Sequence, residues 1–170
     1  MKRGKGVLAL STADHTFTGP ARVEGGVLKV DAAAALANTM VELAGGGLAV
    51  GSGTATVGGL AGGGIVQGGD LAVTGALAPA ANQDGYFYLT GALTVHPQAV
   101  LDLSAFDDGA FTTRDTLFLA AVEGPVTVPE SFRVQPAAKL AKSGMRAKTV
   151  VADGCLFVTF QSGGTTIIIR

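Results

Sequence analysis

The residues Asp102, Asp107, Asp108 and Asp115 form the one concentration of carboxylates in this 170-residue sequence. Carboxylate oxygens grouped in this way are ligands that Ca²⁺ prefers, and Arg114 among them would suit a base that removes a proton from an acidic polysaccharide. The same segment, FDDGAFTTRD, also has the composition of a polar loop with an Asp-Gly turn. We expect the loop, and we expect no catalytic, cofactor-binding or metal-binding residues in the chain.

The spacing of the histidines and the single cysteine does not indicate a metal site or a catalytic site. Asp14-His15 would suit a metal site or an acid–base pair, but a solvated corner is the more ordinary interpretation of such a pair in a turn-like segment. His96 has no second histidine near it in the sequence. Cys155 has no electropositive neighbour in sequence that would activate its thiol, so we expect a small, buried or half-buried side chain rather than a reactive one.

The segment YFYL at 86–89 is the densest aromatic patch. Strand alternation would place Tyr86 and Tyr88 on one face and Phe87 and Leu89 on the other. Tyrosine rings on an exposed face could stack on sugars, which would make the chain an adhesin or a glycan-binding module. An ordinary strand with one buried face is the favoured interpretation.

Composition excludes several classes of protein. The formal net charge is −1 and 15% of the residues are charged, so no basic field attracts nucleic acid or an anionic membrane. One cysteine rules out an internal disulfide framework. No apolar run approaches the ~20 residues of a membrane-spanning helix, and MKRGKG precedes a strand pattern rather than the apolar region of a signal peptide. We expect any signal or anchor to lie outside this segment.

A short apolar motif bounded by glycine recurs along the first half of the chain, as GVLAL, GGVLKV, GGGLAV, GGDLAV and TGALTV. Its leucines are Leu8, Leu28, Leu48, Leu71 and Leu93, separated by 20, 20, 23 and 22 residues. Periods of this size are typical of solenoids, and the alternation of apolar and other residues indicates strands. We therefore expect a parallel β-helix in which each repeat is one coil stacked on the preceding coil, with the last four of these leucines inside.

The second half of the chain has a different organisation. We assign residues 1–103 to parallel coils of about 20–23 residues and residues 104–170 to C-terminal strands that cap the same domain. Asp153-Gly154 favours a type I′ turn between two alternating runs, which predicts a hairpin over 147–160. Antiparallel strands at this end would cover the edge of the last coil, whereas the N-terminal edge near Val7 has no such cover.

Four further segments complete the expected elements. The run DAAAALAN at 31–38 favours a helical turn or a bulge at one corner. Strands are expected over 99–106, 115–122 and 132–136. A last strand, TTIIIR, is expected after the QSGG turn.

The opening segment resembles the passenger-associated β-strand repeat of autotransporters. The family pattern is Lys-x-Gly-x-Gly-x-Leu-x-Leu-Ser, then a turn, an aromatic residue, Thr-Gly, and Val-x-x-Gly-x-Leu-x-Val. The matching residues are Lys2, Gly4, Gly6, Leu8, Leu10, Ser11, Ala13, Phe17, Thr18, Gly19, Val23, Gly26, Leu28 and Val30. Asp14 and His15 stand where the family often has Asn, and the resemblance is strong over 2–80.

The resemblance implies a right-handed β-helix that is a structural, non-catalytic segment of an exported surface protein. Such a segment supports folding, secretion and display of the passenger outside the cell or at the bacterial surface. Its expected partners are neighbouring coils of a longer parent chain, a second copy through open solenoid ends, or a host glycan or surface polymer, without nucleic acid and without insertion into a membrane. The alternatives are an adhesin or glycan-binding module and, less expected, a β-helix polysaccharide lyase or hydrolase.

Overall fold

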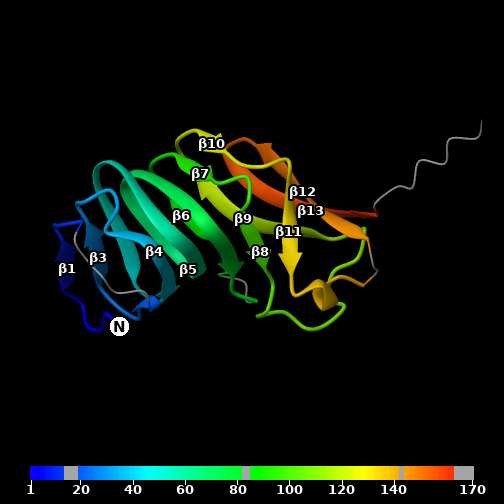
Figure 1. Cartoon of the computed structure of the whole chain (residues 1–170), viewed down its shortest axis with the longest axis horizontal. Coiled ribbons are helices and arrows are strands. Elements are labelled where there is room, and N and C mark those ends of the chain that lie inside the picture. The colour runs from blue at the N-terminus through cyan, green and yellow to red at the C-terminus, as the bar shows by residue number, and fades with distance from the viewer. Residues whose placement is uncertain (14–18, 82–84, 142–143, 163–170) are drawn as a thin grey trace, which may run out of the picture.

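The protein is an all-β solenoid with antiparallel strands at its C-terminal end, as seen in a computed structural model (Figure 1). The structure describes residues 1–13, 19–81, 85–141 and 144–162. The expected TTIIIR strand lies outside these residues. Within them the elements are β1 (Val7–Leu10), β2 (Ala21–Val23), β3 (Val27–Val30), β4 (Leu36–Ala44), β5 (Gly47–Pro79), β6 (Phe87–Leu89), β7 (Leu93–Val95), β8 (Val100–Asp102), β9 (Thr116–Val122), β10 (Val126–Thr127), β11 (Ser131–Gln135), the 3₁₀ turn η1 (Ala137–Lys139), β12 (Met145–Ala152) and β13 (Cys155–Ser162).

The first coils stack in parallel with the expected register. Leu8 lies beside Leu28, and Leu28 lies beside Leu48, so the first three motif leucines form one column. Leu28, Leu48, Leu71 and Leu93 are at most 3% exposed, which confirms that they face the interior. The parallel solenoid predicted from the motif is therefore confirmed.

The 23-residue step from Leu48 to Leu71 does not stack these two residues, which corrects the simple repeat. A Cβ built on Gly68 would lie 2.2 Å from the Val50 carbonyl oxygen, so the residues around 66–68 lie over those around 48–50. The first column therefore continues toward Val66, which pairs with Leu89. Leu71 and Leu93 belong to a separate column that continues to Val126.

Parallel pairing continues beyond residue 103, so a further coil lies within the range that the sequence assigned to the cap. The strands β9, β10 and β11 pair in parallel with β6, β7 and β8 respectively. The pairs Leu89–Val122, Leu93–Val126 and Leu101–Val134 each span 33 residues. The only stretch common to these three intervals is 101–122, so the extra residues of this coil lie at one corner.

The predicted hairpin is present and closes the C-terminal end. β12 and β13 are antiparallel, and Asp153 and Gly154 between them have φ of 50° and 71°, as a type I′ turn requires. β13 pairs with the outer edge of β9, while β12 pairs with β11. The hairpin therefore covers the edges of two of the three strands of the last coil.

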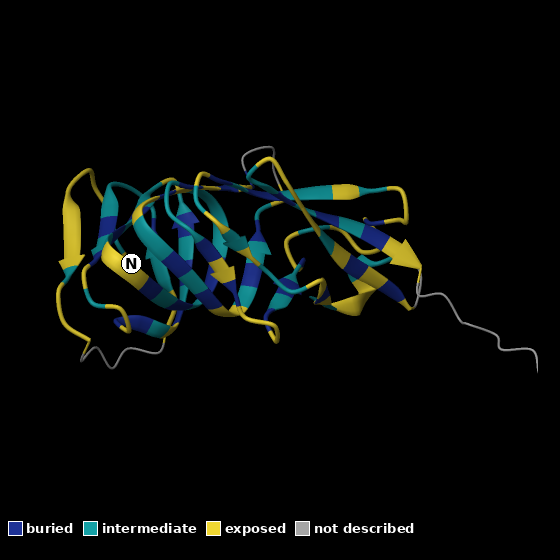
Figure 2. Cartoon of the chain, turned by 90° about the horizontal axis from the view of Figure 1, so that it is seen from above, coloured by how far each residue is buried: buried dark blue, intermediate teal, exposed yellow. Residues whose placement is uncertain are grey.

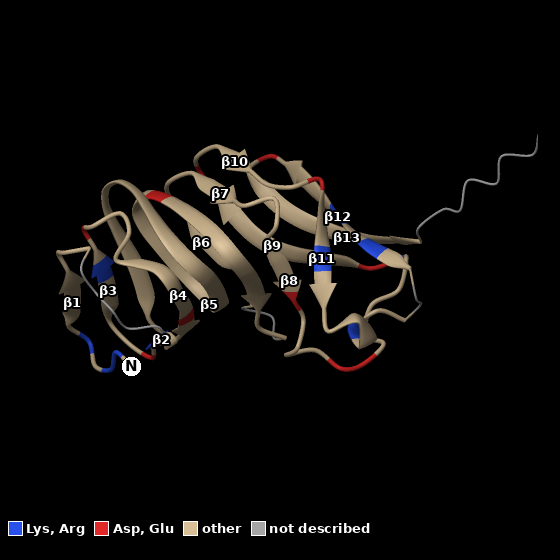
Figure 3. Ribbon diagram, in the orientation of Figure 1, with Lys and Arg blue, Asp and Glu red and all other residues tan. Residues whose placement is uncertain are grey.

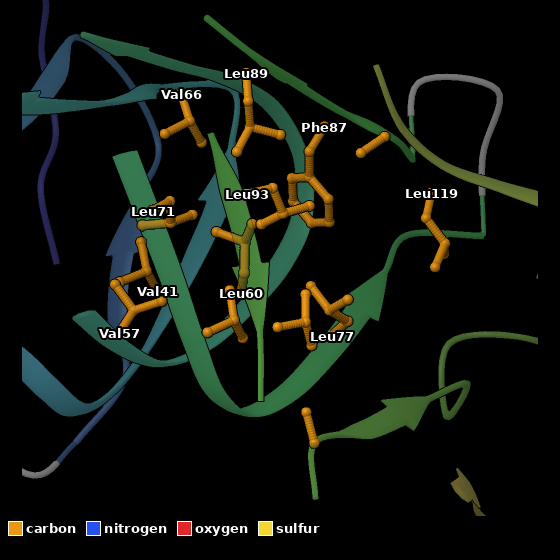
Figure 4. Close-up of a cluster of buried hydrophobic side chains, with 14 of the residues drawn as sticks. Val41, Val57, Leu60, Val66, Leu71, Leu77, Phe87, Leu89, Leu93 and Leu119 are labelled. Carbon is orange, nitrogen blue, oxygen red and sulfur yellow. The ribbon is translucent and has the colours of Figure 1, made fainter. Parts of the chain in front are cut away.

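The interior is a continuous apolar core along the axis (Figures 2 and 4). Figure 4 shows Leu60, Leu71, Leu77 and Leu93 pointing toward one another from different sides of the coil. The run at 31–38 forms no helix: its backbone makes turns with hydrogen bonds from Ala35 N to Ala32 O and from Ala37 N to Ala34 O, and Leu36 begins β4. This is the turn at a corner that the sequence allowed.

Candidate functional site

The predicted acidic cluster does not converge on a common point. The Asp102 carboxylate accepts a hydrogen bond from the backbone N–H two residues later, at 2.9 Å. Asp108 pairs with Lys139 at 2.9 Å. Asp115 accepts hydrogen bonds from the backbone N–H and the hydroxyl of Thr112, at 2.6 and 2.7 Å, and these bonds lower the pKa of its carboxyl. Two of these carboxylates bind groups of their own loop, and Asp108 binds Lys139 of η1, so the three have separate partners.

The described residues near this cluster do not form a metal-binding geometry. The Asp107 carbonyl accepts a hydrogen bond from Ala110 N at 3.2 Å, and Arg114 N donates to Thr112 Oγ1 at 3.3 Å, as in a folded turn. Across the described parts of the chain, no group of three or more His, Cys, Asp or Glu side chains could hold a metal ion. The arrangement supports the polar-loop interpretation.

The other candidate residues that the structure describes, His96 and Cys155, have only local contacts or none that suggest a site. His96 follows β7, and its Nδ1 accepts a hydrogen bond from Gln98 N at 3.2 Å, which closes a local turn. Cys155 is half-buried as the first residue of β13 and is a free cysteine. Asp14 and His15 lie outside the described residues, so the solvated corner expected there stays a prediction.

The tyrosines of YFYL have the alternation that the sequence predicts. Phe87 and Leu89 are 2% and 1% exposed, whereas Tyr86 and Tyr88 are each 37% exposed. The Tyr88 hydroxyl donates a hydrogen bond to the carboxylate of Glu123, one coil further along the stack. This hydrogen bond raises the pKa of Tyr88 because it holds the phenolic proton.

The N-terminal end of the solenoid is open. Among the described residues β1 pairs only with β3, through bonds such as Val27 N to Gly6 O at 3.2 Å. Backbone groups alternate in direction along a strand, so the N–H and C=O groups of Val7 and Ala9 point away from β3 and form a free edge. Val7 and Leu8 are 65% and 46% exposed, and this end of the rod is coloured as exposed in Figure 2.

A hollow of about 290 Å³ lies inside this open end. Its apolar lining includes the buried Val23 and Leu28 together with Leu8 and Leu10, which are less covered because no coil lies beyond them among the described residues. Lys2 closes part of the rim, since its Nζ donates hydrogen bonds to backbone carbonyls that include Gly4 O at 2.7 Å. The end thus combines a free strand edge with an apolar floor.

Charged side chains link successive coils beside the hollow. Arg3 binds Glu24 at 2.7 Å, and Arg22 binds both Glu24, at 3.1 Å, and Glu42 in the next coil. The hydrogen bond from Arg3 is the main reason that the pKa of Glu24 is lowered, and the hydrogen bond to Glu42 is the main reason that the pKa of Arg22 is raised. These contacts connect successive coils at the surface, beside the strand pairing of β2 with β4 that sets their register.

The sequence reasoning missed these charged contacts. Their signal was available, because Arg22 and Glu42 are one 20-residue repeat apart and so face each other in β2 and β4. Opposite charges separated by one repeat length therefore predict contacts between coils. The hollow had no such signal, since it depends on how the first coil covers the core.

Comparison with known proteins found no matching family model, no matching curated protein and no matching solved structure. Within the described residues, no helix has the length and the apolar composition needed to cross a membrane.

Proposed function

We propose that this chain is a structural β-solenoid segment of an exported, autotransporter-like surface protein. It supports the folding, secretion and display of a passenger at the bacterial cell surface or outside the cell, without catalysis of its own. The observation that carries the proposal is the asymmetry of the two ends: a hairpin covers two strand edges of the last coil, whereas β1 has a free edge over an apolar hollow.

This asymmetry suits a rod that is extended at its N-terminal end. A strand added beside β1 would satisfy the free N–H and C=O groups of Val7 and Ala9 and would cover Leu8. The occupant we propose is a neighbouring coil of the same parent chain, which would need the same inward-facing alternation. In a solenoid each coil contacts only its neighbours, so a coil added here would leave the rest of the stack unchanged.

The lyase or hydrolase alternative finds little support in the described residues. Asp108 is paired with Lys139, and Asp115 is hydrogen-bonded to Thr112. A calcium-dependent proton abstraction would need these carboxylates to converge on one ion. Their separate local contacts favour a loop that stabilises a corner.

The proposal is tested by display of an N-terminal reporter. The chain is placed between a signal peptide with an epitope and an outer-membrane translocator, and surface epitope is measured on intact cells with and without external protease. Gly154→Val should reduce display several-fold, because Gly154 has φ of 71° and its added Cβ would lie 2.6 Å from the Val122 carbonyl oxygen. Gly109→Val is the matched control, since its φ is 67° and its Cβ would have nothing within 4 Å.

Replacement of residues 2–162 by an unstructured linker of equal length decides the matter. Display that falls with the linker and with Gly154→Val supports a folded scaffold. Equal display with the linker would contradict the proposal.

A further inference from the structure

A row of aromatic rings crosses the outer face of the capped end. The Tyr86 and Phe118 ring centroids are 5.0 Å apart, and those of Phe118 and Phe157 are 5.1 Å apart. Val150 lies opposite Phe157 on the neighbouring strand and is 39% exposed. Because these residues come from the position before β6 and from β9, β13 and β12, the row runs along the rod. Tyr86 and Val150 are exposed and Phe118 and Phe157 are half-buried, so the row is an apolar stripe that is partly open to solvent.

A polar row runs beside the aromatic row on the same outer face. Thr159 pairs with Thr116 on one side and with Lys148 on the other. Lys148 in turn pairs with Ser131 of β11. Two residues along β13, Gln161 pairs with Arg146. Each of these positions has the same parity as Phe157 or its partners, so hydroxyl and cationic groups project next to the rings.

The cations on this face have no acidic partner among the described residues. Arg146, Lys148 and Arg133 are exposed, and none of them appears in an ion pair within 4.0 Å in the described parts of the chain. Figure 3 shows Lys and Arg positions on β11 and on the neighbouring hairpin strand at the capped end. The face therefore offers positive charge that its own chain does not neutralise.

The opposite border of the aromatic row carries the other sign of charge. Tyr88 lies next to Ala121 in the paired strands and donates its hydroxyl proton to Glu123. The row therefore has a carboxylate, Glu123, along one border and two cations, Arg146 and Lys148, along the other. A ligand lying on the rings would turn its anionic groups toward the two cations.

We propose that this face binds an acidic polysaccharide, a polymer whose sugar rings carry carboxylate or sulfate groups. The sugar faces would lie on Tyr86, Phe118 and Phe157, because polarised C–H groups are attracted to the negative faces of aromatic rings. The anionic substituents would meet Arg146 and Lys148, and the threonine hydroxyls would bind ring oxygens and hydroxyls. The row crosses several neighbouring strands, so it fits an extended polymer rather than a small molecule that needs a pocket.

Other acidic polymers fit these observations less well. Single-stranded nucleic acid uses a cationic groove that follows its backbone, whereas here the cations lie only on one side of the rings and Glu123 lies on the other. An acidic peptide would use the cations and leave the rings without a matching flat partner. The combination of a ring row with charge along one border favours a sugar polymer.

Binding is measured by calorimetry on the purified chain with polygalacturonate, heparin, neutral dextran and polyglutamate. We expect binding to polygalacturonate or heparin, with the stronger of the two identifying carboxylate or sulfate as the recognised group. The double variant Arg146→Gln/Lys148→Gln should weaken it roughly tenfold, and Tyr86→Ala roughly fivefold. The matched control is Lys5→Gln/Lys29→Gln, which removes the same charge at the open end.

The outcomes separate clearly. Acidic-sugar binding that survives in the control and falls in both test variants supports the proposal. No binding to either acidic polysaccharide, equal binding to polyglutamate, or an equal loss in the control variant would overturn it. Thermal unfolding of each variant checks the fold, and none of these substitutions should change epitope display, so failure here leaves the scaffold proposal intact.

Discussion

The parallel coils and the antiparallel hairpin solve the problem of close packing with different residues. Of the 26 glycines, 20 lie in residues 1–91, where backbones of successive coils approach closely. An added Cβ at Gly62, for example, would lie 2.1 Å from the Leu43 carbonyl oxygen. The hairpin instead uses large side chains, and the rings of Phe111 and Phe160 stack at 4.4 Å. Successive coils can therefore pack closely because glycine has no side chain at the contact, whereas the cap is stabilised by the packing of large aromatic side chains.

The two regions also differ in whether they leave strand edges free to pair with a further coil. Each coil pairs with the preceding coil through one edge of its strands and leaves the opposite edge free, so another coil can pair there. The hairpin partners are local, joined by a two-residue turn at Asp153-Gly154, and they use up the edges of β9 and β11. A regular repeat and a single irregular closure are therefore both needed for a rod of defined polarity.

The largest expected effect tests the coil interior. Leu48→Asp buries an unpaired carboxylate at a position that is 0% exposed, and it should cost more than about 5 kcal/mol and abolish cooperative unfolding. Ala49→Asp is the matched control, because Ala49 lies beside Lys29 on the other side of the strand and should change stability by less than about 0.5 kcal/mol. Chemical denaturation measures both, and an unchanged unfolding midpoint for Leu48→Asp would refute the register described for these coils.

The next effect compares the two ends. Phe160→Ala should destabilise the chain by about 3–5 kcal/mol, since Phe160 is 1% exposed and stacks on Phe111. Leu8→Ala should cost under about 1 kcal/mol, because Leu8 is already 46% exposed at the open end. Differential scanning calorimetry gives both values, and equal losses would show that the N-terminal edge is covered in solution.

A smaller effect isolates the close approach of coil corners. Gly62 and Gly53 have φ of 87° and 97°, so alanine at either position is strained by about 1 kcal/mol. Only at Gly62 does the new Cβ meet a backbone carbonyl, and there the loss should be larger by about 1–3 kcal/mol. Urea unfolding of Gly62→Ala and Gly53→Ala measures the difference. Equal costs would mean that backbone conformation alone explains the corner glycines.

The smallest effect concerns the contact between Tyr88 and Glu123. The hydrogen bond raises the folded pKa of Tyr88 above its ordinary value of 10.0, so its stabilisation is present below that pH and is lost as pH rises through the folded pKa. In a Tyr86→Phe background Tyr88 is the one remaining tyrosine, and its ultraviolet titration can be followed alone. Glu123→Gln should shift this titration to lower pH. A titration that does not move would show that the hydrogen bond is absent in solution.

Much of the solenoid could be predicted because its cause is repeated along the sequence. The alternation around Leu28 and Leu48 appears at a constant spacing, and the same physical pattern at each copy indicates the same burial. The step to Leu71 could not be placed, because the register there depends on which glycines lie over Val50. The last coil was missed as well, since its strands are separated by extra residues that hide the period.

The aromatic face at the capped end could likewise be predicted only in its local part. The alternation of Tyr86 and Tyr88 with buried neighbours was local and was predicted correctly. The convergence of Phe118, Phe157 and Lys148 on one face depends on strand pairing between distant segments, and no short stretch of sequence contains it.

The 33-residue spacing on three sides of the last coil has a practical consequence. The extra residues lie within 101–122, and β9, β10 and β11 still pair in register with the coil before them. The length of the chain at this corner can therefore change without a change in the pairing of the strands. A foreign peptide grafted at this corner would leave those strand pairings in place if it preserved the hydrogen bond from Gly109 N to Ala138 O and the packing of Phe111 on Phe160. Natural variation in length should collect at this same corner, as it does wherever a loop leaves a regular scaffold.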